Sequence, residues 1–257
     1  MDEALYRLHA EREGTYWWWV AKNRIILSLI ERYFWRGRAG GTGPFRALDV
    51  GCGAGGVLAR LARRFDAVGV DMSPIAREYC ARRGLIALDG ALPDAMPLGH
   101  PAFREGFDVI VASEVIEHIR EDRASVAALV RLLKPGGVIV CTVPAHMWLW
   151  SSHDDFNHHR RRYTRSQFGA LFDGLPVRTH VLSCCQMCSM PLVAAGRAVE
   201  KIRTRITGKP PPEPEVTPLP GPVNWALTKA FESEKFWLPH AGLPWGTSVI
   251  SVHGRDS

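Results

Sequence analysis

The glycine-rich segment 46–56, RALDVGCGAGG, constrains this chain most. A short apolar run, 47–50, leads straight into glycines, and an apolar helical pattern follows from Val57. A strand, a glycine turn and a helix N-terminus in this order bring backbone N–H groups and the positive helix end up to a ligand. A Cβ would block that approach, and several φ angles there are expected to be positive. The segment therefore predicts a ligand-binding turn.

The glycine spacing alone leaves the ligand open. Gly51, Gly53 and Gly56 satisfy G-x-G-x-x-G, and Asp71 follows at the distance that suits a dinucleotide fold. A tight turn without a ligand is the other alternative. Asp49 favours a third interpretation, because a carboxylate beside the turn repels a pyrophosphate but can hold an ammonium group through water or backbone. S-adenosylmethionine (SAM) carries an amino acid and a sulfonium where NAD carries two phosphates.

Four segments in order resemble the class I SAM-dependent methyltransferases. Residues 48–55 are similar to the first motif of that family, 68–73 to its second strand, 107–119 to its fourth strand and turn, and 132–140 to the approach to its fifth. The resemblance implies an α/β, Rossmann-like, doubly wound sheet of seven strands, parallel except for one antiparallel strand. It also implies SAM as cofactor and S-adenosylhomocysteine as product.

The same resemblance implies a set of cofactor-binding residues. Asp71 is expected to accept both ribose hydroxyls, or else to cap the helix that starts at Ser73. Asp89 is expected near the adenine, or in a plain turn, and His118 either near the cofactor or capping a turn. The full set is Trp18, Arg24, Asp49, Gly51, Cys52, Gly53, Gly55, Asp71, Met72, Asp89, Gly90, Ser113, Glu114 and His118.

Alternating patterns predict the element boundaries. Strands are expected at 46–50, 67–71, 85–88, 107–112, 137–143, 177–183 and 248–252, and helices at 55–64, 74–82 and 123–133. Residues 1–40 are interpreted as an N-terminal helical lid and 41–257 as the methyltransferase domain, with an insertion at about 187–240. Within the insertion, helices are expected at 187–206 and 224–236, with a proline-rich stretch at 207–222 that is extended or disordered.

Charge and hydropathy narrow the partners. The formal net charge is +6, but the densest basic run, Arg160–Arg162, is too short for a nucleic-acid groove. No apolar run reaches 18 residues, so we expect a cytoplasmic chain without a membrane segment. An aromatic, lipid-like or anionic small-molecule acceptor fits better. The insertion is free to cap the acceptor pocket, form a homodimer or touch a membrane surface.

The loop after the fifth strand, 144–164, is predicted to receive the acceptor. We interpret His159 as a general base oriented by Asp154, with His153 and His158 as alternates, because a carboxylate fixes the histidine tautomer and raises its basicity. Two alternatives remain: the loop is merely braced by His159 and Arg161–Tyr163, or His153, Asp154 and His158 or His159 form a metal site. No metal is expected.

Residues 149–164 also resemble a bacterial subgroup related to quinone-biosynthesis and small-molecule methyltransferases. The resemblance implies methyl transfer to a small or lipid-like acceptor, with oxygen favoured over nitrogen or carbon. One rival is a nicotinamide oxidoreductase that uses Gly51–Gly56 for pyrophosphate. The other is a SAM-binding partner protein without turnover.

Overall fold

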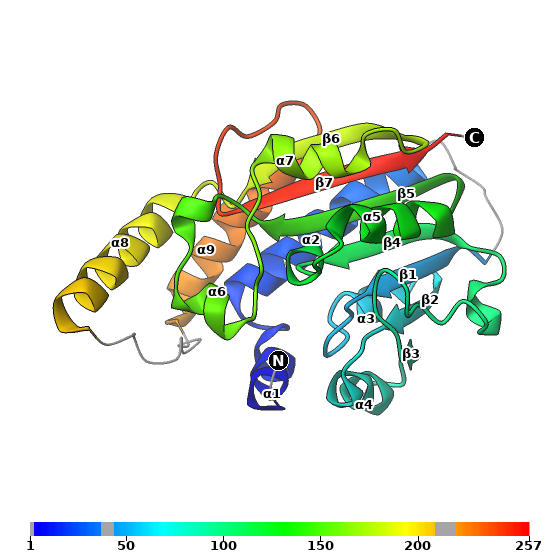
Figure 1. Ribbon diagram of the computed structural model, residues 1–257, viewed down its shortest axis with the longest axis horizontal. Helices are drawn as coiled ribbons and strands as arrows, with labels where there is room; N and C mark the ends of the chain where they lie inside the picture. Colours follow the sequence, from blue (N-terminus) through cyan, green and yellow to red (C-terminus); the bar gives the residue numbers. More distant parts are fainter. Residues whose placement is uncertain (1–2, 37–43, 209–218, 257) are drawn as a thin grey trace.

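A computed structural model describes residues 3–36, 44–208 and 219–256. Within them, seven strands form one sheet in the order β3-β2-β1-β4-β5-β7-β6 (Figure 1). Strands β1 to β5 pair in parallel, and β7 runs antiparallel to both of its neighbours, as predicted. The strands are β1 (Arg46–Val50), β2 (Asp66–Val70), β3 (Ala87–Leu88), β4 (Phe107–Ser113), β5 (Leu133–Pro144), β6 (Val177–Cys185) and β7 (Ser248–Arg255).

Alternating apolar residues give the sheet two buried faces. In β4, Val109 and Val111 enter one hydrophobic cluster, whereas Ile110 and Ala112 enter the other. The first cluster includes α2 (Trp17–Ile30) and α9 (Gly221–Glu232), and the second includes α5 (Asp122–Leu132) and α7 (Arg165–Gly169). Figure 1 shows α5 and α7 on the near face and α2 behind the sheet. This is the doubly wound arrangement that the sequence predicts.

Some element boundaries differ from the prediction. Helix α3 spans only Leu58–Leu61, because Gly55 has φ +90°, which a right-handed helix cannot contain. Strand β5 begins at Leu133, earlier than predicted, since Leu133 pairs with Phe107 across an irregularity in the β4–β5 ladder. Helix α4 (Pro74–Arg82) matches its prediction, and Ser73 caps it by accepting from the Ala76 N–H.

The insertion packs on the N-terminal segment. Asn224 of α9 accepts from the Trp17 N–H and donates to the Thr15 carbonyl, both at 2.9 Å. The Phe231 ring meets the Trp17 ring edge-on, at 6.2 Å between centroids. The N-terminal elements are α1 (Glu3–Arg12), α2 and a π-helical turn, η1 (Glu31–Trp35). Segments more than 200 positions apart in sequence therefore form one layer over the sheet.

One part of the insertion prediction was wrong. Gly221 and Pro222 belong to α9, although the sequence predicted an extended stretch to 222. A proline fits the first turn of a helix because an N–H there has no intrahelical partner. Helix α9 continues into a 3₁₀ turn, η6 (Ser233–Phe236). At the other end, Thr207 is the last residue of the preceding helix. Residues 209–218 of the predicted stretch lie outside the described residues.

Helix α8 (Met190–Thr207) buries none of its residues. Leu192, Val199, Ile202 and Ile206 are all well exposed on it. In Figure 1 the helix projects away from the sheet beside α9. Across the part of the chain that the structure describes, no helix is both long enough and apolar enough to cross a bilayer.

Replacing Phe231 tests the contact between α9 and α2. Phe231 is 3% exposed, and Phe231→Ala is expected to lower the free energy of unfolding by about 3–5 kcal/mol, because it removes a buried ring and leaves a cavity. Urea unfolding measures the change. Trp225→Ala on the same helix is the matched control: Trp225 is 64% exposed, so the loss should stay within about 0.5 kcal/mol. Equal losses in the two variants would contradict the packing described here.

Candidate active site

The glycine turn follows β1 and returns toward β2. The N–H groups of Gly51 and Cys52 both donate to the Val70 carbonyl. Gly51 has φ +63°, and a Cβ there would lie 2.5 Å from a Val115 methyl. Gly53 has φ +52°, yet a Cβ there would meet nothing within 4 Å. Gly51 is thus required by packing and conformation, whereas Gly53 faces open space that a ligand can enter.

Asp49 lies beside this turn with an unpartnered oxygen. It is 2% exposed, and its Oδ2 has no hydrogen-bond partner. Burial raises the pKa of Asp49 to about 8. A buried carboxyl oxygen without a partner is costly and suits a cationic ligand group. The amino group of SAM is such a group, so Asp49 and the open space at Gly53 fit the cofactor that the sequence implies.

Asp71 braces the glycine turn. Its Oδ2 accepts from the Gly53 N–H and its Oδ1 from the Ser73 N–H, both at 2.9 Å. The helix cap belongs to Ser73, so the capping alternative for Asp71 was wrong. Each carboxylate oxygen keeps a second lone pair, which leaves Asp71 able to accept from ribose hydroxyls. The neighbouring Met72 is 73% exposed.

The loop after β3 holds the predicted adenine residues. Asp89 is largely exposed and pairs with Arg77 at 2.6 Å. Arg77 also donates to the Asp71 carbonyl, which links the ends of β2 and β3. Gly90 packs closely, because a Cβ there would lie 2.9 Å from Val70. Cys52, in the glycine turn, is buried, and its Sγ lies 3.9 Å from the Cys80 Sγ of α4.

Lys22 of α2, which the sequence did not indicate as a site residue, lies near the end of β4. Ser113 and Thr142 share a hydrogen bond at 2.9 Å between their hydroxyls. The next residue, Glu114, has φ +58°, and its carboxylate lies 3.9 Å from Lys22 Nζ. Burial lowers the pKa of Lys22, whose Nζ stands 3.9 Å from the centre of the Trp18 ring. A single lysine among tryptophans and isoleucines in α2 carries no sequence signal of this role.

Two residues of the N-terminal segment, Tyr6 and Glu13, lie beside the glycine turn and Asp71. Glu13, in the turn after α1, packs its carboxylate against Gly56 and pairs with Arg83. Tyr6 of α1 is buried, and burial is the main reason that its pKa is raised. The charge of Asp71 raises this pKa further, whereas a hydrogen bond with Ser73 lowers it. Neither Tyr6 nor Glu13 was singled out from the sequence. Arg24, a predicted cofactor residue, pairs with Glu232 of α9 at 2.7 Å.

Asp154 is the centre of the loop after β5. It is fully buried in the short helix α6 (Ser152–Phe156), and its Oδ1 lies 2.8 Å from His159 Nδ1. Arg162 donates from Nε to Oδ1 at 2.8 Å and from Nη2 to Oδ2 at 2.9 Å. Burial alone would raise the pKa of Asp154, but the bonds from His159 and Arg162 outweigh it and hold the pKa well below its usual range. The predicted His159–Asp154 contact is therefore present.

Neighbouring residues brace the same loop. Arg161 pairs with Asp122 at 2.7 Å, and the Tyr163 hydroxyl donates to the same carboxylate at 2.9 Å. Arg160 Nε donates to the His118 carbonyl. The bracing interpretation thus holds for these residues alongside the His159–Asp154 pair.

The histidines of this region gather differently from the set that the metal-site alternative would need. Among the described residues, the group with ligand spacing is Glu117, His118 and His159, whose ligand atoms lie within 4.8 Å of one another. His153 is outside this group, and burial, together with Arg197, lowers its pKa to about 4. His158 has φ +56°, and its carbonyl faces His118 Nδ1 at 3.4 Å.

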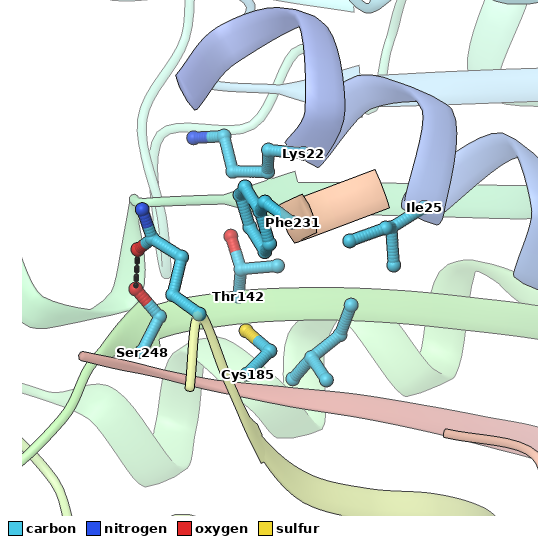
Figure 2. Close-up of a pocket in the computed structure, with 8 residues that line it drawn as sticks. Lys22, Ile25, Thr142, Cys185, Phe231 and Ser248 are labelled. Atoms are coloured by element: carbon cyan, nitrogen blue, oxygen red, sulfur yellow. Dashed lines mark hydrogen bonds between the residues drawn. The ribbon is translucent and has the colours of Figure 1, made fainter. Parts of the chain in front are cut away.

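A narrow crevice lies between α2, α9 and the ends of β5, β6 and β7. Figure 2 shows Lys22, Ile25 and Phe231 on the helices above the sheet, facing Thr142, Cys185 and Ser248 on the strands below. The Gln186 side-chain oxygen accepts from the hydroxyls of Thr247 and Ser248 at its rim. The crevice combines an apolar wall with the buried side-chain amine of Lys22.

The pH dependence of stability tests Asp49. At about pH 6, the folded state holds a proton that the unfolded state, with an ordinary pKa of 3.8, has lost. The contribution of Asp49 to the free energy of unfolding therefore falls as the pH rises toward 8. The free energy of unfolding of the wild type minus that of Asp49→Asn should fall by about 2 kcal/mol between about pH 6 and pH 8. Denaturant titrations at both pH values measure it, and a constant difference would contradict the burial of an unpartnered carboxyl.

Residues 16–175 match the family model described as "Methyltransferase domain". The chain is 37% identical over 100 residues to a ubiquinone biosynthesis O-methyltransferase of Methylococcus capsulatus, which covers 37% of this chain and 41% of that protein. It is 40% identical over 103 residues to its counterpart from Cereibacter sphaeroides, covering 38% and 40%. The chain thus spans about two fifths of the length of these relatives.

Solved structures share the fold at low identity. A plantazolicin methyltransferase in complex with a substrate analogue and S-adenosylhomocysteine superposes with a TM-score of 0.57 at 15% identity, covering 98% of this chain and 89% of that one. A sarcosine dimethylglycine methyltransferase from Galdieria sulphuraria gives 0.52 at 15% identity, covering 90% and 86%. The nicotinamide interpretation was wrong. The family match, the glycine turn and the unpartnered Asp49 oxygen agree, and the chain belongs to the methyltransferase domain family as a class I SAM-dependent methyltransferase.

Proposed function

We propose that this chain methylates an oxygen atom of a small, hydroxyl-bearing acceptor, with His159 as the general base. The observation that carries the proposal is the 2.8 Å contact between His159 Nδ1 and the buried Asp154 carboxylate. O-methylation of a hydroxyl needs a group that removes its proton, and a histidine paired with a carboxylate meets that need at neutral pH.

Asp154 selects the tautomer of His159. Because the bonds from His159 and Arg162 keep the pKa of Asp154 low, its carboxylate is ionised and accepts from Nδ1–H. The Nε2 atom of His159 then carries the free lone pair. A proton taken up at Nε2 produces an imidazolium that the buried carboxylate stabilises. Arg162 holds Asp154 by two bonds, so the base has a fixed orientation.

The proposed cofactor contacts lie at the same edge of the sheet as the base. The cofactor supplies an activated methyl group, so the chain contributes mainly proximity and alignment. We assign Asp49 to the amino group and Asp71 to the ribose. The open space at Gly53 leaves room between them. The carboxyl ends of β1 and β2 carry these groups, and the loop after β5 carries His159, because parallel strands end at a common edge.

The side chains that line the crevice favour an acceptor with an apolar body and a polar or anionic substituent, although the crevice itself is too narrow to admit a ligand without movement of its walls. Ile25 and Phe231 offer apolar surface, and Lys22 offers a buried amine that can donate hydrogen bonds. The relatives named for ubiquinone biosynthesis agree with an acceptor of this type, by name alone. We propose that the described part of the N-terminal segment, residues 3–36, forms a lid over this edge, because Tyr6, Glu13 and Trp18 all lie beside it.

Replacing His159 tests the base. His159→Ala should lower kcat by about 10²–10⁴-fold, because the acceptor proton loses its acceptor group. The affinity for S-adenosylhomocysteine, measured by calorimetry, should change less than about twofold, since His159 does not contact the glycine turn. Turnover is followed by product mass with simple phenols and catechols as probe acceptors.

His240→Ala is the matched control, because His240 is an exposed histidine in the turn after η6. It should leave both quantities unchanged. If His159→Ala weakened S-adenosylhomocysteine binding as much as it slowed turnover, His159 would be a brace for the loop and the base assignment would fall.

A further inference from the structure

We propose that Glu117, His118 and His159 form a binding site for a divalent transition-metal cation. The inference stands on the geometry of these side chains; only the role of the ion toward the acceptor rests on the proposed function. Glu117 and His118 belong to the 3₁₀ turn η3 (Ile116–His118) after β4, and His159 to the loop after β5. The two loops are tied together by the Arg160 N–H, which donates to the Glu117 carbonyl.

Glu117 is the strongest evidence for a ligand. Its side chain is fully buried, and neither carboxylate oxygen has a hydrogen-bond partner. Its Oε1 lies 3.9 Å from His118 Nε2 and 3.9 Å from His159 Nε2. These separations are too long for hydrogen bonds. Because an unpartnered buried carboxylate costs several kcal/mol, the structure calls for a group that lies between the three side chains.

The two histidines present lone pairs to the same point. His159 bonds a carboxylate through Nδ1, so its Nε2 is the unprotonated nitrogen. His118 Nδ1 faces the His158 carbonyl at 3.4 Å, and a carbonyl only accepts, which leaves the His118 Nε2 lone pair free as well. A metal-binding histidine characteristically donates its other N–H to a carboxylate or a carbonyl, as both do here.

The donor set indicates the kind of ion. One carboxylate and two imidazoles suit Mn²⁺, Fe²⁺, Co²⁺ or Zn²⁺ better than Mg²⁺ or Ca²⁺, which prefer oxygen ligands. Bonds of about 2.1 Å place two ligands of one ion about 3.0–3.4 Å apart, so binding requires the 3.9 Å gaps to close by roughly half an ångström or more. Three protein ligands leave positions for an acceptor oxygen.

The cation and the base cannot use His159 Nε2 at the same time. With the ion bound, His159 is a ligand, and the ion lowers the pKa of the acceptor hydroxyl in place of the base. His118 separates the two cases. His118→Ala removes a ligand but leaves the His159–Asp154 pair intact, so it should slow turnover only if the ion takes part.

Metal binding is measured directly on the full chain. Chelator-treated protein is titrated with Mn²⁺, followed by the loss of the free-ion electron paramagnetic resonance signal, and with Zn²⁺ by calorimetry. The wild type should bind one ion, and Glu117→Gln and His118→Ala should each weaken binding by about 10–100-fold. Glu78→Gln and His240→Ala are matched controls at exposed positions and should bind as the wild type does.

S-adenosylhomocysteine binding monitors the fold of each variant and the cofactor site separately. Unchanged nucleoside binding with lost metal binding supports the site. The absence of one-to-one binding by the wild type, or wild-type binding by the near-isosteric Glu117→Gln, overturns it. If metal binds as expected but chelator treatment leaves turnover unchanged, the acceptor role of the ion falls. If metal binds but no acceptor is methylated, the proposed function fails and the cation site stands.

Discussion

Parallel strand pairing is the constraint on which the whole site depends. Strands β1, β2, β4 and β5 run in the same direction, so their carboxyl ends lie along one edge. Asp49, Asp71, Glu114 and Thr142 lie at or beside that edge, although 93 positions separate the first from the last. Every group assigned to the cofactor or the acceptor follows one of these strand ends or packs over them.

A buried carboxylate organises the acceptor side of this edge. Asp154 has no access to water, and Arg162, His159 and the Ser151 N–H together satisfy it. Removing one partner of such a buried charge typically costs about 3–5 kcal/mol, so the loop has little freedom to rearrange. The same residues therefore brace the loop and orient the proposed base: Arg162 fixes Asp154, and Asp154 fixes His159.

Glu117 is the counterexample within the same few residues. Asp154 is buried with its hydrogen bonds made, whereas Glu117 is buried with none from its carboxylate. The two carboxylates flank His159, one bonded to Nδ1 and the other 3.9 Å from Nε2. Asp154 therefore orients the imidazole ring, whereas Glu117 faces its other nitrogen as a ligand of the proposed cation site.

Much of the fold and part of the site followed from the sequence. The glycine turn, the alternating strands and the His159–Asp154 pair were predictable because each depends on local spacing or on a motif. Lys22 and Tyr6 could not be found in this way, since helical side chains over a sheet edge carry no motif. The chain order determined which residues end strands; only the tertiary structure decided that Glu117, His118 and His159 face one another. Their meeting depends on how two loops 40 residues apart pack, which no local pattern records.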